Sequence, residues 1–305
     1  MLLMAIPPLV QIAERPQPLP RPSWLRSRAP FGENFHRLKQ LARGLELHTV
    51  CESARCPNLG ECWHHGTATF MLLGEICTRR CGFCAVPKGR PLPIDDDEPR
   101  RVAEAVATLD LRHAVLTSVN RDDDNLGGAR IFAQSIAAIR ERASGCKVEV
   151  LIPDFKGSRE ALEIVIAARP DILNHNTETV PELYRFVRPG ARFERSLELL
   201  AWVKQIAPDM LSKTGLMLGL GETQAQLEAA LRRLASTGCD ILTLGQYLQP
   251  TRHHLPVKRF YSPEEFAILR QFGMNCGFRH VEAGPLVRSS YHAYAQAEGL
   301  STARK

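Results

Sequence analysis

Two groups of three cysteines stand close together in the first third of the chain. The first group is spaced C-x4-C-x5-C and the second C-x3-C-x2-C, at Cys51, Cys56 and Cys62 and at Cys77, Cys81 and Cys84. Thiolates in tight loops suit soft metals, but structural zinc takes four closed ligands, commonly from two C-x2-4-C pairs. An iron–sulfur cubane held by three cysteines leaves one iron open. The spacings therefore favour iron–sulfur chemistry at an open iron.

A zinc site and disulfide bonds are the other interpretations of these cysteines, and both fit the sequence less well. His64 or His65 could complete a zinc site, but adjacent histidines in a loop are more often solvated than ligating. Disulfides are not expected, because the chain has nine cysteines, an odd number, and no secretory signal. Cys146, Cys239 and Cys276 stand singly at the ends of expected elements. That position predicts small buried or half-buried thiols.

The elements that must position these cysteines alternate along the chain. Apolar runs bounded by turn residues predict six strands, at 69–76, 113–119, 147–153, 171–176, 214–220 and 240–246. Helical patterns follow them at 98–109, 129–143, 158–168, 193–207, 222–236 and 262–274. Thr223 and Ser262 stand near or at the starts of their helices, where side-chain oxygens accept free N–H groups. This order predicts an α/β protein with parallel strands, in a doubly wound sheet or a partial barrel.

Reactive groups in either architecture belong in the loops that follow the strand C-termini. The second cysteine triad begins directly after the first predicted strand. Polar strand ends at 117–123 (TSVNRDD) and 174–179 (NHNTET) reach the same rim. The segment GLMLGLGE at 215–222 supplies glycines that let the backbone approach a ligand closely. Taken alone, this last segment indicates only a tight strand-to-helix turn.

The spacing C-x3-C-x2-C, with Phe83 just before the last cysteine, resembles the signature of the radical S-adenosylmethionine (SAM) superfamily. GLMLGLGE follows that superfamily's G-x-I-x-G-x-x-E pattern, with Met217 at the isoleucine position. Segments such as LHTVCESARCPNLGECW, VRPGARFERSLELL and GPLVRSSYHA are similar to the lipoyl synthase family over nearly the whole chain. The resemblance implies a partial (β/α)6 TIM-like barrel at 69–260. It also implies an auxiliary-cluster segment at 1–68 and a C-terminal extension at 261–305 that carries the R-S-S-Y motif.

The same resemblance implies two [4Fe-4S] clusters and SAM as cofactors. The cluster that binds SAM would be held by Cys77, Cys81 and Cys84, and the auxiliary cluster by Cys51, Cys56, Cys62 and Ser290, the second serine of R-S-S-Y. Spacing alone predicts only a turn at this serine, since serine is a rare iron ligand. The residues expected around SAM are Thr117, Ser118, Asn120, Asn174, Asn176, Glu178, Gly215, Met217, Gly219, Glu222 and Gln246.

The reaction implied by the resemblance is radical insertion of two sulfur atoms, taken from the auxiliary cluster, at C6 and C8 of a protein-bound octanoyl chain. Those C–H bonds have no acidifying neighbour, so general-base chemistry cannot remove their hydrogens. The implied partners are an octanoylated lipoyl carrier domain (an E2 subunit or glycine-cleavage H protein), a ferredoxin- or flavodoxin-type reductant and an iron–sulfur carrier for cluster repair. The alternative enzyme is another radical sulfur inserter, biotin-synthase-like or methylthiotransferase-like. A ferredoxin-like electron carrier is the alternative outside catalysis, but it would not need six strand–helix units.

Composition and charge exclude several other classes of protein. The net charge of +6, from 39 basic and 33 acidic residues, is spread without a Lys/Arg block, which does not predict nucleic-acid binding; an acidic protein partner remains possible. No apolar run approaches a membrane span, so we expect a cytoplasmic protein without membrane contact. The seven prolines among the first thirty residues disfavour a transit helix and predict an arm lying over the fold. Asp95–Asp97 and Asp122–Asp124 are expected to be solvated loop acids rather than a cation site.

Overall fold

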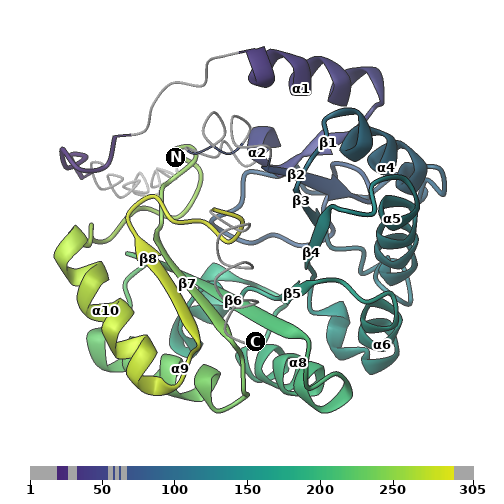
Figure 1. The fold of residues 1–305 in the computed structure, drawn as a ribbon. Coiled ribbons are helices and arrows are strands. Elements are labelled where there is room, and N and C mark those ends of the chain that lie inside the picture. The colour runs from purple at the N-terminus through teal and green to yellow at the C-terminus, as the bar shows by residue number, and fades with distance from the viewer. Residues whose placement is uncertain (1–18, 27–32, 54–57, 59–61, 63–66, 292–305) are drawn as a thin grey trace, which may run out of the picture.

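The computed structural model describes residues 19–26, 33–53, 58, 62 and 67–291. One sheet curves into an open barrel, and the long helices pack on its outer side (Figure 1). Its strands are β1 His48–Thr49, β2 Thr67–Leu72, β3 His113–Ser118, β4 Lys147–Leu151, β5 Ile172–Asn174, β6 Leu211–Leu218, β7 Ile241–Gln246 and β8 His280–Gly284. The helices are α1 Glu33–Gly44, α2 Val50–Ser53, α4 Glu98–Thr108, α5 Ala129–Arg142, α6 Arg159–Ala167, α7 Tyr184–Val187, α8 Phe193–Ile206, α9 Gln224–Ala235 and α10 Pro263–Cys276.

The strands are ordered β1 to β8 across the sheet, and all neighbours from β2 to β8 are parallel. The six predicted strands and their six helices are confirmed, and so is the partial-barrel class. The structure adds β1, which pairs antiparallel with β2, and a seventh parallel strand, β8. The sheet therefore crosses both of the predicted domain boundaries, near 68 and 260, and that division stays a prediction.

Helix ends follow from local side-chain chemistry. Thr223 precedes α9 and Ser262 precedes α10, and each forms a reciprocal capping box with the residue three positions later, Gln226 or Glu265. α10 ends at Gly277, whose φ of 109° is a left-handed conformation that glycine adopts without a side-chain clash. The helix starts predicted at Thr223 and Ser262 are confirmed. None of the described helices is long and apolar enough to cross a membrane.

The core lies between the sheet and its helices, because the central strands are covered on both faces. Every residue of β2 and of β7 is buried, as expected for parallel strands. Cys146 and Cys239 are buried beside this core and Cys276 is half-buried, as predicted. Asp95–Asp97 are exposed and Asp122–Asp124 are exposed or half-buried, so the prediction of solvated loop acids is confirmed. Asp95, Asp97, Asp122 and Asp123 also form ion pairs with arginines.

The barrel interior contains a buried ionic network beneath the strand ends. Glu149 on β4 and Lys213 on β6 are both fully buried, with Oε1 and Nζ 3.1 Å apart. The Asn174 amide donates to Glu149 at 3.1 Å, and His113 Nε2 lies 3.4 Å from the same carboxylate. Burial alone would raise the pKa of Glu149, but the charge of Lys213 lowers it to about 2. This network fills the barrel below the functional site.

Candidate active site

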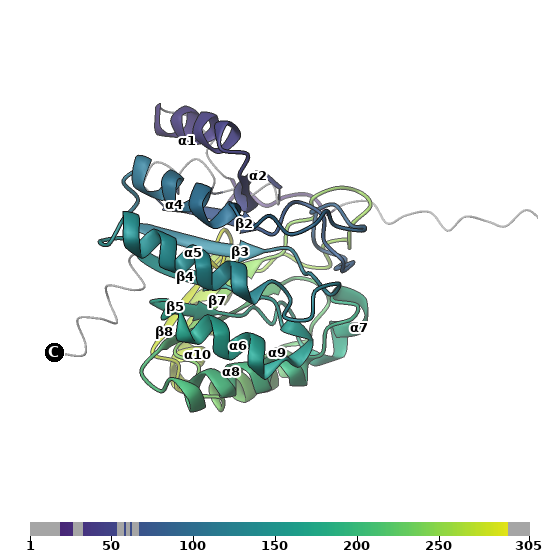
Figure 2. The same cartoon turned by 90° about the vertical axis from the view of Figure 1, so that its right-hand side faces the viewer.

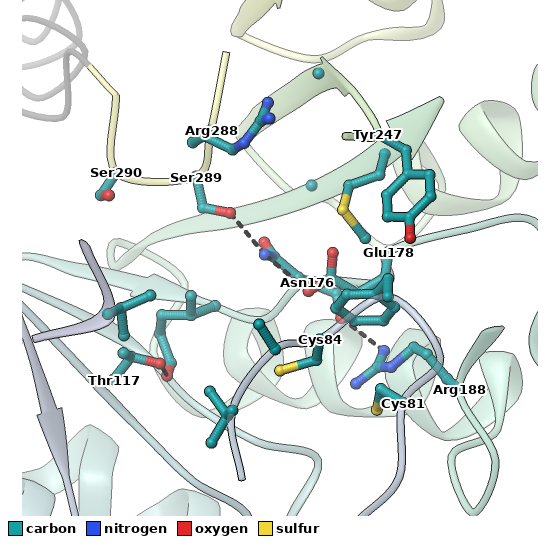
Figure 3. Close-up of a pocket in the computed structure, with 18 of the residues that line it drawn as sticks. Cys81, Cys84, Thr117, Asn176, Glu178, Arg188, Tyr247, Arg288, Ser289 and Ser290 are labelled. Carbon is teal, nitrogen blue, oxygen red and sulfur yellow. Dashed lines mark hydrogen bonds between the residues drawn. The ribbon is translucent and has the colours of Figure 1, made fainter. Parts of the chain in front are cut away.

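A cavity of about 560 Å³ opens at the carboxyl ends of the strands. The loop after β2 contributes Cys77, Cys81 and Cys84, and the turn after β8 contributes Ser289 and Ser290 (Figure 3). The predicted cofactor residues on its wall are Thr117, Ser118, Asn120, Asn176, Glu178, Gly215 and Met217. Segments that are more than 200 residues apart in the chain therefore meet around one space.

The cysteine loop is held in place by its backbone. Cys77 donates its N–H to the Pro87 carbonyl at 2.8 Å, and the N–H of Asn120 points to the Cys77 sulfur at 3.4 Å. His254 Nε2 lies 3.0 Å from the Cys84 carbonyl oxygen. Burial raises the pKa of Cys84 to about 11 and also raises that of Cys81, so binding iron must release protons from these thiols.

No three His, Cys, Asp or Glu side chains among the described residues gather where a single metal ion could be held. Cys77, Cys81 and Cys84 instead line one wall of the cavity, all half-buried. Three cysteines on one cavity wall can hold an iron–sulfur cubane with one iron open, whereas a structural zinc site is closed by four ligands. The residues present therefore fit such a cluster.

An arginine inside the cysteine loop ties that loop to two neighbouring strand ends. Arg79 is 5% exposed, and its guanidinium pairs with Asp122 at 2.8 Å and with the fully buried Asp154 at 2.6 Å. Arg195 pairs with the second oxygen of Asp154 at 3.1 Å. Burial by itself would raise the pKa of Asp154, but Arg79 holds it well below its usual range. The loop between the first two cysteines is thereby fixed by buried charges.

Replacing Asp154 with asparagine is expected to reduce the free energy of unfolding of the cluster-free protein by about 3 kcal/mol. Removing one partner of a fully buried ion pair costs about 3–5 kcal/mol. The lower end of this range is expected here, because Asp122 still pairs with Arg79 when Asp154 is replaced. Faster hydrogen exchange at the amides of residues 78–82 should accompany this loss. The measurements are denaturant unfolding and hydrogen-exchange mass spectrometry.

The matched control for this prediction is Asp95→Asn. Asp95 pairs with Arg101 on the exposed face of α4, at 2.6 Å. Exposed pairs contribute about 0–1 kcal/mol, so this variant should unfold nearly as wild type. Equal losses in the two variants would reject the role given to Asp154.

Asn176 connects the two ends of the site. Its Nδ2 donates to Ser289 Oγ at 2.6 Å and to Glu178 Oε1 at 3.1 Å, and its carbonyl accepts from Arg188 Nη1 at 2.8 Å. Figure 3 shows Asn176 between Ser289 and Arg188. Glu178 has a φ of 67°, a left-handed conformation that is costly for a non-glycine residue and clusters at functional sites. Burial raises the pKa of Glu178, opposed by the charge of Arg188.

Several cavity residues hold buried polar atoms that lack a hydrogen-bond partner among the described residues. These atoms are Arg79 Nη1, Ser118 Oγ, Asn176 Oδ1 and Arg188 Nε. Buried polar groups are nearly always satisfied, so unpaired ones around a cavity indicate a polar ligand. SAM carries amino, carboxylate and ribose hydroxyl groups that can pair with both donors and acceptors. The residues present therefore fit SAM.

Four of the predicted cofactor residues lie away from the cavity wall. Gln246 donates to backbone carbonyls, including that of Leu218 at 2.9 Å, and Glu222 accepts the N–H groups of residues 219–221. Gly219 has a φ of 97°, and a side chain there would collide with Gln246. Asn174 belongs to the buried network around Glu149. These residues stabilise the strand ends, and their direct contact with SAM stays a prediction.

The first triad is described only in part. The side chain of Cys51 and the whole of Cys56 lie outside the described residues, while Cys62 is half-buried. Cys62 donates its N–H to the Asn58 carbonyl at 3.0 Å, and Asn58 Nδ2 donates to the Leu286 carbonyl at 2.6 Å. The Cys62 segment is thus joined to the segment that leads to Ser290.

The turn that carries Ser290 fits closely over β7. A side chain at Gly245 would collide with the carbonyl of Val287, so only glycine allows this approach. The backbone N–H of Tyr291 donates to the carbonyl oxygen of Arg288 at 2.9 Å, which confirms the turn predicted there.

Sequence reasoning missed three side chains at the site. Arg188 stands in the quoted segment VRPGARFERSLELL, and Arg79 stands between two cysteines, but neither position reveals a buried partner. Ser289 is the neighbour of the serine that was singled out. A basic residue inside a cysteine motif was the available signal for Arg79, whereas Arg188 lies far from both triads in the sequence and carried no such signal.

The fold and this cavity define a class of enzyme that the family comparison also identifies. The model of the radical SAM superfamily matches residues 71–234, more than half of the chain. Two solved structures share the fold at low sequence identity. They are methylornithine synthase (TM-score 0.52, 16% identity, 81% of each chain) and the FeFe-hydrogenase maturase HydG from Carboxydothermus hydrogenoformans (TM-score 0.55, 14% identity, 88% of this chain and 70% of that one). The chain is a radical SAM enzyme.

Relatives of higher sequence identity identify one family within this superfamily. The model of the N-terminal domain of lipoyl synthase matches residues 11–56. The lipoyl synthase of Koribacter versatilis is 66% identical over 95% of this chain and 96% of its own. That of Rubrobacter xylanophilus is 58% identical over 91% of this chain and 87% of its own. The chain belongs to the lipoyl synthase family, radical SAM sulfurtransferases that use SAM and [4Fe-4S] clusters, an auxiliary cluster among them.

Proposed function

We propose that this enzyme makes lipoyl groups by inserting two sulfur atoms at C6 and C8 of an octanoyl chain carried on a lipoyl domain. The observation that carries the proposal is the shared cavity, where the cysteine loop and the R-S-S-Y turn face one space. When bound, the two clusters and SAM supply a 5′-deoxyadenosyl radical for hydrogen abstraction and the sulfur that is inserted. The protein must supply ligands, a fixed geometry and a dry path for the acyl chain.

We assign Cys77, Cys81 and Cys84 to the cluster that binds SAM. Arg79 fixes their loop through Asp122 and Asp154. This rigidity supports catalysis, because the reacting groups must be held in one geometry for radical transfer to compete with side reactions.

SAM is held, in this proposal, by the polar residues beside the cysteines. Arg188 is buried, keeps an unpaired Nε and lies at the cavity, which suits a carboxylate. Asn176 and Glu178 offer an amide and a carboxylate for hydroxyl or amino groups, with Thr117, Ser118 and Asn120 at the next strand end. Gly215 allows Thr243 and Asn176 to approach the backbone closely, since a side chain at Gly215 would collide with both. Met217 lines the cavity beside it.

The auxiliary cluster is assigned to Cys51, Cys56, Cys62 and Ser290. The contact of Asn58 with Leu286 supports this set, because it holds the first triad's segment beside the C-terminal turn. An oxygen ligand suits iron less well than a thiolate does. That difference favours opening of the cluster at the serine corner as sulfur leaves.

Apolar side chains line the space between the two groups of ligands. Met71, Leu151, Leu216 and Val287 are among them. An eight-carbon acyl chain gains free energy when it leaves water for such a surface. The cavity can therefore receive the octanoyl arm between the radical source and the sulfur source.

The finer assignments of partners extend this proposal. The acyl chain is presented by an E2 subunit or a glycine-cleavage H protein, a ferredoxin- or flavodoxin-type protein supplies electrons, and an iron–sulfur carrier rebuilds the auxiliary cluster. A cytoplasmic location stays a prediction from the sequence. Another radical sulfur inserter, biotin-synthase-like or methylthiotransferase-like, is no longer favoured, because the relatives are lipoyl synthases over nearly the full length.

The test is anaerobic incubation of the reconstituted protein with SAM, dithionite and an octanoylated carrier domain. Mass spectrometry of the acylated peptide should detect first one and then two added sulfur atoms. Omission of SAM is the control and should leave the octanoyl chain unchanged. An unchanged octanoyl chain in the complete reaction, despite two intact clusters, would contradict the proposed function.

A further inference from the structure

Exposed basic side chains stand on the cysteine loop and on the two segments that contact it. They come from three segments, 77–92, 181–192 and 249–260, and each segment also contributes residues to the cavity wall. We call the set the basic collar; its members are Arg80, Lys88, Arg90, Arg185, Arg252 and Lys258, all exposed. A partner that inserts an acyl arm into the cavity must pass this collar.

Short contacts hold the three segments together as one surface. Gly82 donates its N–H to the Val187 carbonyl at 3.0 Å and accepts from the Leu255 N–H at 3.1 Å. His254 reaches the Cys84 carbonyl, as described above. These segments lie at the end of the barrel where α7 is seen (Figure 2). The three collar segments therefore lie side by side at the cysteine loop.

Negative charge is nearly absent from the collar segments. They contain ten Lys and Arg residues against one acidic residue, Glu182, whereas the whole chain has 39 against 33. Within the described part of the chain, no carboxylate pairs with a collar residue. The aspartates of the adjacent loops are already engaged, Asp122 with Arg79 and Asp123 with Arg121. The collar consequently keeps a net positive charge, although Arg90 also lies close enough to Asp123 to lower the pKa of that carboxylate, to which Arg121 contributes most.

An exposed aromatic ring stands within this charged surface. Phe186 on α7 is 65% exposed, although its neighbours Tyr184 and Val187 are buried. Its carbonyl lies against Gly82 of the cysteine loop. Aromatic and arginine side chains are enriched in protein interfaces and supply much of their binding energy. The Arg185–Phe186 pair thus has the character of an interface centre.

We propose that the basic collar and Phe186 dock the octanoylated carrier domain through an acidic face that surrounds its acylated lysine. This inference rests on the proposed function, which requires a carrier to present the acyl arm at this mouth. Charge of one sign at a cleft mouth speeds association with a partner of opposite sign and orients it. A carrier is favoured over a nucleic acid, because the three charged segments also contribute to the wall of a partly apolar cavity, and the chain has no block of Lys and Arg residues.

The experiment compares two double variants with equal charge change, Arg185→Glu/Arg252→Glu in the collar and Arg112→Glu/Arg142→Glu as the control. Arg112 and Arg142 are exposed at the opposite end of the barrel, where α5 ends and β3 begins. Binding of an octanoylated carrier domain to each holoenzyme is measured at low and at physiological salt. Thiolation is measured with that domain and with a short, uncharged octanoyl-lysine peptide.

The collar variant should bind the carrier domain at least about tenfold more weakly than wild type at low salt, with a smaller salt dependence. Its rate with the uncharged peptide should match that of wild type, and the control variant should match wild type in every assay. Unchanged carrier binding by the collar variant would overturn the inference, as would carrier binding that a mixed-sequence RNA displaces. Failure of wild type to thiolate either substrate would instead reject the proposed function, while the binding comparison would still decide the role of the collar.

Discussion

Formation of 5′-deoxyadenosine from SAM is expected to fall to zero when Cys77, Cys81 and Cys84 are replaced together by alanine. These three thiols are the only cysteines that line the cavity in the described part of the chain, and SAM cleavage requires an electron from the cluster assigned to them. The variant should retain about half of the iron, because the second [4Fe-4S] cluster has its own ligands. The measurements are chromatography of the nucleoside product and Mössbauer spectroscopy.

A conservative control accompanies this variant. Cys276→Ala removes a half-buried thiol at the end of α10, away from the cavity, and should cleave SAM as wild type does. Persistent cleavage by the triple variant would show that the radical arises elsewhere, and the assignment of the cysteine loop would be wrong.

Replacement of the first cysteine triad should abolish sulfur insertion but not SAM cleavage. With Cys51, Cys56 and Cys62 replaced by alanine, SAM cleavage should continue at a measurable rate while no thiolated peptide forms. The reason is that the radical-generating ligands remain intact and the assigned sulfur source is gone. Parallel assays of 5′-deoxyadenosine and of thiolated octanoyl peptide test this expectation.

Ser290→Ala refines the same test, since it removes the fourth assigned ligand and leaves all six cysteines. Reduced iron content at the auxiliary site, with the SAM-binding cluster unchanged, is the expected result. Normal thiolation by the Cys51, Cys56 and Cys62 variant would mean that the sulfur comes from another source.

Most of the barrel could be predicted from the sequence, because its strands are buried on both faces and read as apolar runs between turn residues. β8 escaped prediction for the opposite reason. Its sequence HVEAG is short, and only Val281 within it is buried. β1 is two residues long and gives no periodic signal.

The second cysteine triad could be placed at the site from the sequence, because the spacing of its three residues is local and it follows a predicted strand. Arg188 and Asp154 could not, since their roles depend on partners brought together by folding: Asp154 pairs with Arg79, which lies 75 positions earlier. The resemblance implied that Gln246 and Glu222 surround SAM, Glu222 through the G-x-I-x-G-x-x-E pattern, but both side chains satisfy nearby backbone groups. A polar residue at the end of a strand can either bind the ligand or stabilise the turn, and only the structure distinguishes the two roles.

The contact between Asn58 and Leu286 also bears on how the protein is made. Its two residues are separated by 228 positions, and at about 5–20 residues per second the ribosome needs roughly 10–45 s to synthesise the intervening chain. The first cysteine triad therefore leaves the ribosome long before the turn with Ser290 exists. With Ser290 as the proposed fourth ligand, stable assembly of the auxiliary cluster must wait until this turn has been synthesised and folded.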